Sequence, residues 1–168
     1  MQLLRKWLQG GETMHKVVVF QLCNEQYAIP VEHVVSIEKM SHPTLIPSMP
    51  SYMLGVVRIR GELVPVLDTS QILYRRPYAE TEKTRLVVVH TGDLHVAFIV
   101  DDAKEIIDIP PHMMKQVNML AYQQTPYFIG IANLPDRLIT VIDPTILFDN
   151  LEGASSIKEH IKNEKQNT

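Results

Sequence analysis

The sequence contains an internal repeat, and this repeat restricts the fold more than any other feature of the chain. Residues 55–68, GVVRIRGELVPVLD, align without gaps to residues 130–143, GIANLPDRLITVID. A second pair lies upstream, where residues 17–37 align to residues 86–106. Two matches in the same order are better explained by a duplicated fold than by chance similarity between apolar strands.

Each repeat predicts a series of short strands separated by turns, as in small β-barrels. In the first repeat Asn24 lies at the turn of one predicted hairpin. Gly61 lies at the turn of the next and supplies the positive φ of a tight two-residue turn. The second repeat has Pro135 and Asp136 at this point, which predicts a turn of another type. We therefore expect a mainly β chain with short helices, in which two barrel subdomains share one core.

Two aspartates occupy equivalent positions at the ends of the aligned hairpins. Asp68 precedes TSQILY and Asp143 precedes PTILFD, so each is placed to cap a short helix, and Pro144 suits the first helical position. We assign both aspartates to capping rather than to catalysis. Four aligned apolar residues are predicted to face the cores: Leu63, Val66, Leu138 and Val141.

The chain divides into an N-terminal extension (1–15), the duplicated domain (16–150) and a C-terminal segment (151–168). The extension is too short and too charged for a secretory signal. It predicts an arm that docks on the domain, and the alternative is a membrane-surface helix. Its apolar residues at helical spacing are Leu3, Leu4, Trp7 and Leu8.

The C-terminal segment predicts one short helix followed by a frayed polar tail. Ser156 and Glu159 have the spacing of a capping box, and Ile157 and Ile161 lie four residues apart on one face. The predicted helix therefore begins near Ser156.

Composition excludes several classes of protein. A hydrophobic content of 45% with 21% charged residues is typical of a globular chain. The net charge of -3 leaves no electrostatic footprint for nucleic acid, and 7% aromatic residues provide no stacking platform. No apolar run is long enough to span a bilayer. The single cysteine, Cys23, rules out an internal disulfide and favours a reducing compartment.

No pattern of catalytic or metal-binding residues is present in the sequence. None of the seven histidines has a metal-ligand spacing, and His90 and His95 are expected to face each other across a hairpin as solvated strand-end residues. The sequence has no phosphate-binding loop or nucleophile elbow. Asp101 and Asp102 are interpreted as a solvated turn rather than an acid–base pair. We expect no enzyme, metal or cofactor, but a module that binds other proteins.

Four stretches of the chain resemble the CheW-like family, whose members couple a histidine kinase to chemoreceptors in bacterial chemosensory arrays. They are VVFQLCNEQYAIPVEHVVSI, PSMPSYMLGVVRIRGELVPVLD, VAFIVDDAKEI and FIGIANLPDRLITVID, and they cover nearly all of Lys16 to Asn150. The resemblance implies two intertwined, five-stranded SH3-like barrels without catalytic activity. It also implies a cytoplasmic protein that is recruited to membrane-associated receptor arrays.

The resemblance implies two partners and a candidate receptor site. The regulatory domain of a CheA-like kinase would dock barrel to barrel, and the cytoplasmic tip of the chemoreceptor helical hairpin would lie in the groove between the subdomains. Carried over residue by residue, the receptor-binding candidates are Val34, Ser36, Ile37, Gly55, Arg60 and Gly61.

The chain departs from the family pattern at Ser36, where relatives often have a glutamate that can pair with the arginine corresponding to Arg60. Because strand side chains alternate, Glu38 points to the same side as Ser36, about 6.7 Å further along. We therefore add Glu38 to the candidates, as the partner of Arg60. The second repeat keeps a glutamate, Glu105, at the position equivalent to Ser36.

Two alternatives to a chemotaxis adaptor remain open at this point. One is a CheW-like paralogue that scaffolds a two-component pathway unrelated to motility. The other, from a different class, is a small β-barrel that binds a ligand or a nucleic acid. Without the family resemblance, Arg60 would be interpreted as a solvated side chain at a hairpin end.

Overall fold

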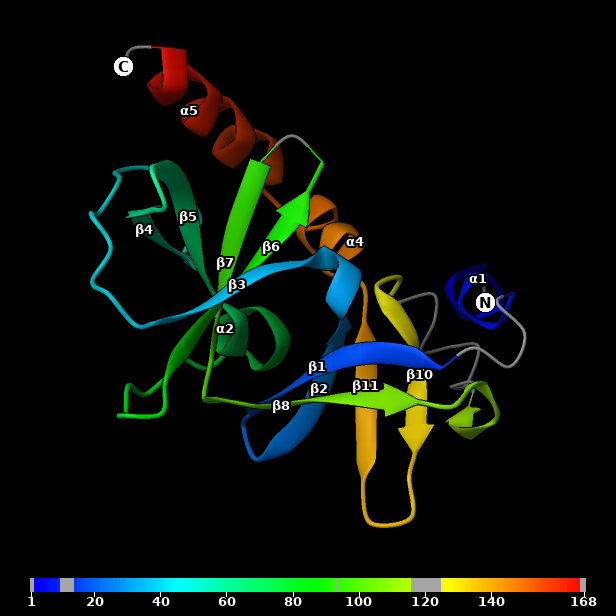
Figure 1. The fold of residues 1–168 in the computed structure, drawn as a ribbon. Helices are drawn as coiled ribbons and strands as arrows, with labels where there is room; N and C mark the ends of the chain where they lie inside the picture. Colours follow the sequence, from blue (N-terminus) through cyan, green and yellow to red (C-terminus); the bar gives the residue numbers. More distant parts are fainter. Residues whose placement is uncertain (1, 10–13, 93, 116–124, 167–168) are drawn as a thin grey trace.

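The fold is built from two β-sheets with short helices at their edges (Figure 1). The computed structural model describes residues 2–9, 14–92, 94–115 and 125–166. One sheet has the strand order β8-β1-β2-β11-β10-β9 and the other has the order β3-β6-β7-β5-β4. The prediction of a mainly β chain is confirmed.

The strands of the six-stranded sheet are β1 (His15–Leu22), β2 (Glu25–Pro30), β8 (Asp102–Ile109), β9 (Met114–Lys115), β10 (Phe128–Asn133) and β11 (Leu138–Ile142). Those of the five-stranded sheet are β3 (Val34–Lys39), β4 (Met53–Ile59), β5 (Glu62–Asp68), β6 (Arg85–Thr91) and β7 (Leu94–Val100). The helices are α1 (Gln2–Leu8), α2 (Thr69–Tyr74), α4 (Pro144–Asp149) and α5 (Ala154–Gln166), with 3-10 turns η1 (Val31–His33) and η2 (Pro111–Met113).

Each sheet draws strands from both repeats. The first repeat contributes β1 and β2 to the six-stranded sheet and β3, β4 and β5 to the other, while β6 and β7 of the second repeat join the five-stranded sheet. Parallel pairs between β11 and β2 and between β5 and β7 connect the two repeats inside each sheet. The repeats are therefore intertwined. This arrangement is compatible with two SH3-like barrels, the short β9 being the extra strand of the six.

Three hydrophobic clusters fill the molecule. The inner cluster of the six-stranded sheet contains Val17, Val19 and Val141, and the inner cluster of the five-stranded sheet contains Val66 and Ile99. The opposite faces of the two sheets meet in a third cluster with α4 and α5, here called the shared cluster. Its largest side chains are Phe20, Phe98 and Phe148.

The turns and caps follow the sequence pattern closely. Cys23 and Asn24 have φ of 51° and 66°, and Arg60 and Gly61 have φ of 53° and 82°, so both hairpins have tight two-residue turns. Asp68 Oδ1 accepts from Gln71 N at 3.1 Å, and burial raises the pKa of this carboxyl. Asp143 Oδ1 likewise accepts from the backbone at the start of α4. Both predicted caps are confirmed.

Leu138 was predicted to lie in a core, and this prediction is wrong. Val66 and Val141 are 0% exposed, but Leu138 is 63% exposed. Alternation along β11 turns Ile139 and Val141 inward and leaves Leu138 on the outer face. The equivalent Leu63 is half-buried against the shared cluster.

Both ends of the chain pack on the domain. Leu4 and Trp7 of α1 are 1% and 6% exposed, and both join the inner cluster of the six-stranded sheet, which confirms the docked arm. Helix α5 begins at Ala154, so the capping box predicted at Ser156 is wrong. Ile157 and Ile161 are buried, as expected from their spacing. Within the described ranges, no helix has the length and apolar character required to span a bilayer.

Tyr52 makes folding sensitive to alkaline pH. Its hydroxyl donates to the Glu152 carbonyl at 2.7 Å, and burial raises its pKa from 10.0 to about 12. Because the folded state holds this proton more tightly, the stability contribution is complete below pH 10 and is lost as the pH rises toward 12. We expect Tyr52→Phe to reduce the loss of stability over this range in urea titrations, and equal slopes for both proteins would contradict this.

Candidate functional site

The candidate receptor residues lie on β3, on β4 and on the turn between β4 and β5. Strands β3 and β4 are the two edges of the five-stranded sheet. Nevertheless, Arg60 Nε at the turn lies 3.5 Å from Glu38 Oε2 on β3. The sheet therefore curls until its edges approach each other, and this contact closes it at one end.

The ion pair between Arg60 and Glu38 agrees with the sequence-based hypothesis. The Arg60 side chain is 71% exposed and that of Glu38 is 30% exposed. Glu38 Oε2 itself is buried and has no hydrogen bond within the described chain, so the 3.5 Å contact is electrostatic rather than a hydrogen bond. Ion pairs with this exposure contribute roughly 0–1 kcal/mol. Arg60 is therefore available for a partner without being required by the fold.

Ser36 is half-buried, and its hydroxyl points away from solvent. Ser36 and Glu38 pair with Val88 and Leu86, two members of the inner cluster. Ser36 Oγ is buried without a hydrogen-bond partner among the described residues. Glu38 lies two residues further along the strand, on the same face as Ser36. Its carboxylate extends to the end of the sheet where Arg60 lies.

Val34 and Ile37 lie on the other face of β3. A bulge between Val34 and Ser36 leaves Val34 half-buried against the shared cluster. Ile37 pairs with the buried Val87 but is itself 41% exposed. Ile37 is therefore the apolar candidate that a partner can reach directly.

Gly55 is required by the backbone rather than by a binding surface. Its φ is +144°, and a Cβ built on it would lie 2.2 Å from the Thr44 carbonyl oxygen. Thr44 and Val56 bond to each other in both directions across this point. Gly61, in contrast, has open space around its Cα and lies on the surface. The structure thus brings Glu38, Arg60 and Gly61 together, whereas Ile37 is exposed on the other face of the edge strand β3; we call these four residues the Arg60 surface.

The second repeat has an ion pair of its own, which the sequence pattern did not predict. Arg137 Nη1 contacts Glu105 Oε1, and it also donates to Gln26 Oε1 at 3.3 Å. Glu105 aligns with Ser36, whereas Arg137 aligns with Glu62, so the charges occupy other positions than in the first repeat. Glu105, at the position aligned with Ser36, was the feature of the sequence that could have indicated this ion pair.

A second group of charges surrounds the residue that follows the Arg60 turn. Glu62 Oε2 lies 3.5 Å from His95 Nδ1 and 3.7 Å from Lys165 Nζ. His90 and His95 face each other with ring centroids 4.6 Å apart, which confirms the expected hairpin pair. Among the described residues, no three or more His, Cys, Asp or Glu side chains lie close enough together to hold a metal ion.

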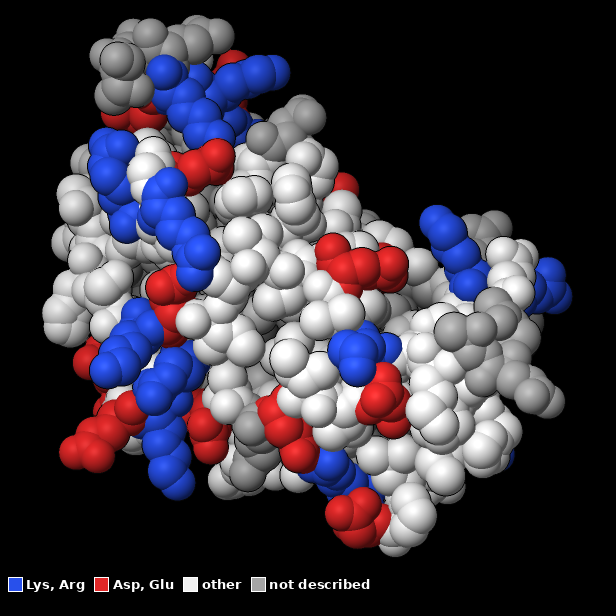
Figure 2. Space-filling view, in the orientation of Figure 1, with Lys and Arg blue, Asp and Glu red and all other residues white. Residues whose placement is uncertain are grey.

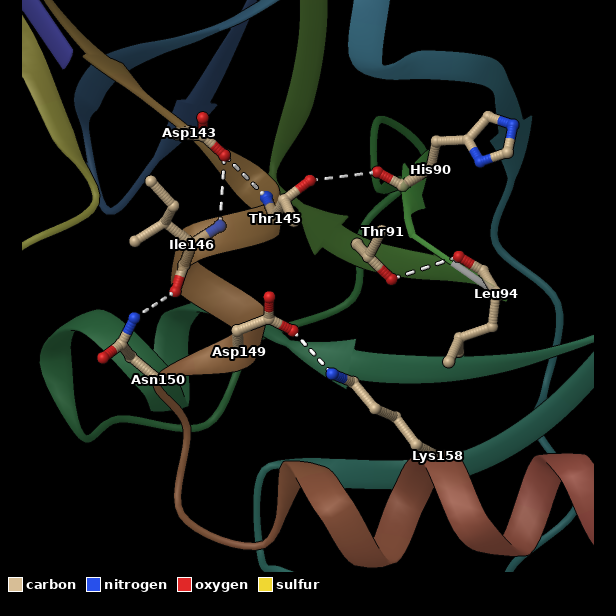
Figure 3. A network of polar contacts seen from close by, with 9 residues as sticks. All are labelled: His90, Thr91, Leu94, Asp143, Thr145, Ile146, Asp149, Asn150 and Lys158. Atoms are coloured by element: carbon tan, nitrogen blue, oxygen red, sulfur yellow. Dashed lines mark hydrogen bonds and ion pairs between the residues drawn. The ribbon is translucent and has the colours of Figure 1, made fainter.

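Several polar groups that line a groove between α5, α4 and the turn after β6 are paired with their neighbours (Figure 3). Its volume is about 510 Å³. Lys158 Nζ donates to Asp149 Oδ1 at 2.8 Å, Thr145 Oγ1 donates to the His90 carbonyl, and Thr91 Oγ1 donates to the Leu94 carbonyl. Lys158, Thr145 and Thr91 are therefore already engaged by groups of the chain itself.

Comparison with known proteins places the chain in one family. A model of the CheW-like domain matches residues 16–152. Chemotaxis protein CheW of Bacillus subtilis is 30% identical over 149 residues, which is 88% of this chain and 96% of that protein. Chemotaxis protein CheW of Helicobacter pylori is 28% identical over 80% of this chain and 81% of its own.

A solved structure gives the same result. The scaffolding protein TtCheW from Thermoanaerobacter tengcongensis has a TM-score of 0.74 at 26% identity, over 86% of this chain and 94% of that one. Sequence and structure thus agree over nearly the whole length of both proteins. The chain belongs to the family of proteins with a CheW-like domain.

Proposed function

We propose that this chain is a non-enzymatic adaptor that couples chemoreceptors to a CheA-like histidine kinase in chemotaxis signalling. The observation that carries the proposal is the family match over residues 16–152, together with relatives that are themselves chemotaxis proteins. The adaptor is cytoplasmic and is recruited to membrane-associated receptor arrays. Nucleic acid is not among its partners.

The Arg60 surface is the proposed contact for the receptor tip. A helical hairpin that docks here meets the exposed guanidinium of Arg60 beside the partly exposed Glu38, and it contacts the apolar side chain of Ile37 by reaching around the edge strand β3. Charge-assisted hydrogen bonds from an arginine fork combined with apolar contact are typical of helix recognition by a groove. The other three candidates have structural roles beside this surface. Val34 packs against the shared cluster, the small Ser36 turns its hydroxyl away from solvent, and Gly55 lets the backbone of β4 lie close to Thr44.

The proposal is tested by measuring the two partners separately. Isothermal titration of the purified chain with the regulatory domain of the cognate kinase, and with a receptor hairpin in a second experiment, is expected to give micromolar or tighter binding in both. A receptor hairpin with its tip residues scrambled is the matched control. If neither partner bound, the proposed function would be wrong.

A further inference from the structure

The C-terminal helix α5 lies against the turn that carries Arg60. Ala154, Ile157 and Ile161 anchor α5 in the shared cluster, with 4%, 0% and 1% exposure. At its other end, Glu164 and Lys165 line one groove with Gly61, Glu62 and Leu63. Figure 2 shows Lys and Arg side chains gathered where α5 ends, with acidic side chains between them. Helix α5 therefore joins the shared cluster to the β4–β5 turn.

The hairpins of the two repeats differ in the elements that pack against them. Leu63 beside α5 is half-buried, whereas the equivalent Leu138 is 63% exposed. The second hairpin is instead held from within its own sheet, because Arg137 contacts both Glu105 and Gln26. In the first hairpin Arg60 pairs with Glu38 and is itself 71% exposed, and Glu62 contacts His95 of the same sheet.

The Arg60 turn also has a strained backbone. Arg60 has φ of 53°, a conformation that residues other than glycine adopt at a cost of roughly 1 kcal/mol. The flanking strands hold such a turn, and contacts from outside the hairpin restrain its backbone further.

Glu62 provides this support because it follows the turn directly and contacts two other elements. Its Oε2 lies 3.7 Å from Lys165 Nζ on α5 and 3.5 Å from His95 Nδ1 on β7. The Glu62 and Lys165 side chains are 46% and 41% exposed, so each contact adds little to global stability.

We infer that Glu62, His95 and Lys165 are positioning residues, through which α5 holds the β4–β5 turn and thereby fixes how Arg60 is presented to the receptor. The inference rests on the proposed function for its receptor part. Helix α5 begins after residue 152, where the family match ends.

The test uses the full chain with Glu62→Gln and Lys165→Met, and Lys162→Met as the matched control on the same helix. Backbone ¹⁵N relaxation of Arg60 and Gly61 reports the order of the turn directly. We expect both test variants to lower the order parameters of the turn and to weaken receptor-hairpin binding up to about fivefold, the size of one exposed ion pair. Kinase-domain binding and the thermal midpoint are expected to stay unchanged, and Lys162→Met to behave as wild type.

The outcomes separate this inference from the proposed function. If wild type binds the receptor hairpin but both variants keep the order of the turn and the same affinity, the inference is overturned. If wild type binds no receptor hairpin, the proposed receptor contact is overturned, and the order parameters still decide whether α5 holds the turn. The double variant combines Glu62→Gln with Lys165→Met. If it loses as much receptor affinity as either single variant, the two residues act through one contact, whereas fully additive losses of affinity would overturn the inference.

Discussion

Phe148→Ala is expected to lower the free energy of unfolding by about 3–5 kcal/mol. Phe148 lies on α4, is 0% exposed and packs in the shared cluster, where both sheets and α5 meet. Truncation would leave a cavity bounded by elements from both repeats, which cannot collapse without moving one sheet against the other. Urea unfolding followed by circular dichroism measures this loss.

Leu138→Ala is the matched control for this experiment. Leu138 is 63% exposed on the outer face of β11, so its truncation is expected to change stability by less than about 0.5 kcal/mol. Comparable losses for the two variants would mean that the shared cluster does not hold the sheets together. Both variants are expected to unfold in one transition, because each sheet contains strands of both repeats and neither repeat can unfold alone.

The duplicated pattern predicted much of the local structure, because local structure depends on neighbouring residues. The turn at Gly61 and the caps at Asp68 and Asp143 were predicted correctly from residue type and position. Strand pairing depends on contacts between distant segments, which periodicity does not specify. The exchange of strands between repeats was therefore expected only from the family resemblance.

The error at Leu138 has the same physical origin. An apolar residue on a strand predicts a face to be covered, but the covering element can come from anywhere in the chain. In the first repeat α5 lies beside Leu63, and no described element covers Leu138 in the same way. The link from Glu62 to Lys165 was missed for this reason too, since the two residues are far apart in sequence.

The candidate site was predicted in part. The two-residue period of a strand was sufficient to identify Glu38 as the residue near Arg60. The same period did not reveal that the Ser36 hydroxyl is buried or that Gly55 lies under Thr44, since both facts depend on how the sheet curls and on the loop that crosses it. Arg137 was missed because its charge lies two positions beyond that of Arg60 in the repeat alignment.

Arg60→Ala is expected to weaken receptor-hairpin binding by roughly 10- to 100-fold while the thermal midpoint stays nearly unchanged. The guanidinium is 71% exposed and its single described ion pair is solvated, so the folded state loses little when it is removed. In a complex, the same group would form charge-assisted hydrogen bonds, each worth about 1.5–3 kcal/mol. Titration calorimetry with the receptor hairpin and thermal unfolding measure the two quantities in parallel.

Two variants locate the cause of this loss. Arg58→Ala removes the same charge from the same hairpin, so a long-range electrostatic effect would weaken binding equally in both, whereas a specific contact weakens it only at Arg60. Glu38→Ala is expected to increase the mobility of the Arg60 side chain and to weaken receptor binding severalfold, because it removes the ion-pair partner. Unchanged mobility and affinity in that variant would contradict the pairing. A large fall in the thermal midpoint of Arg60→Ala would instead mean that the folded state depends on Arg60. The loss of receptor binding would then follow from loss of structure and not from loss of a direct contact.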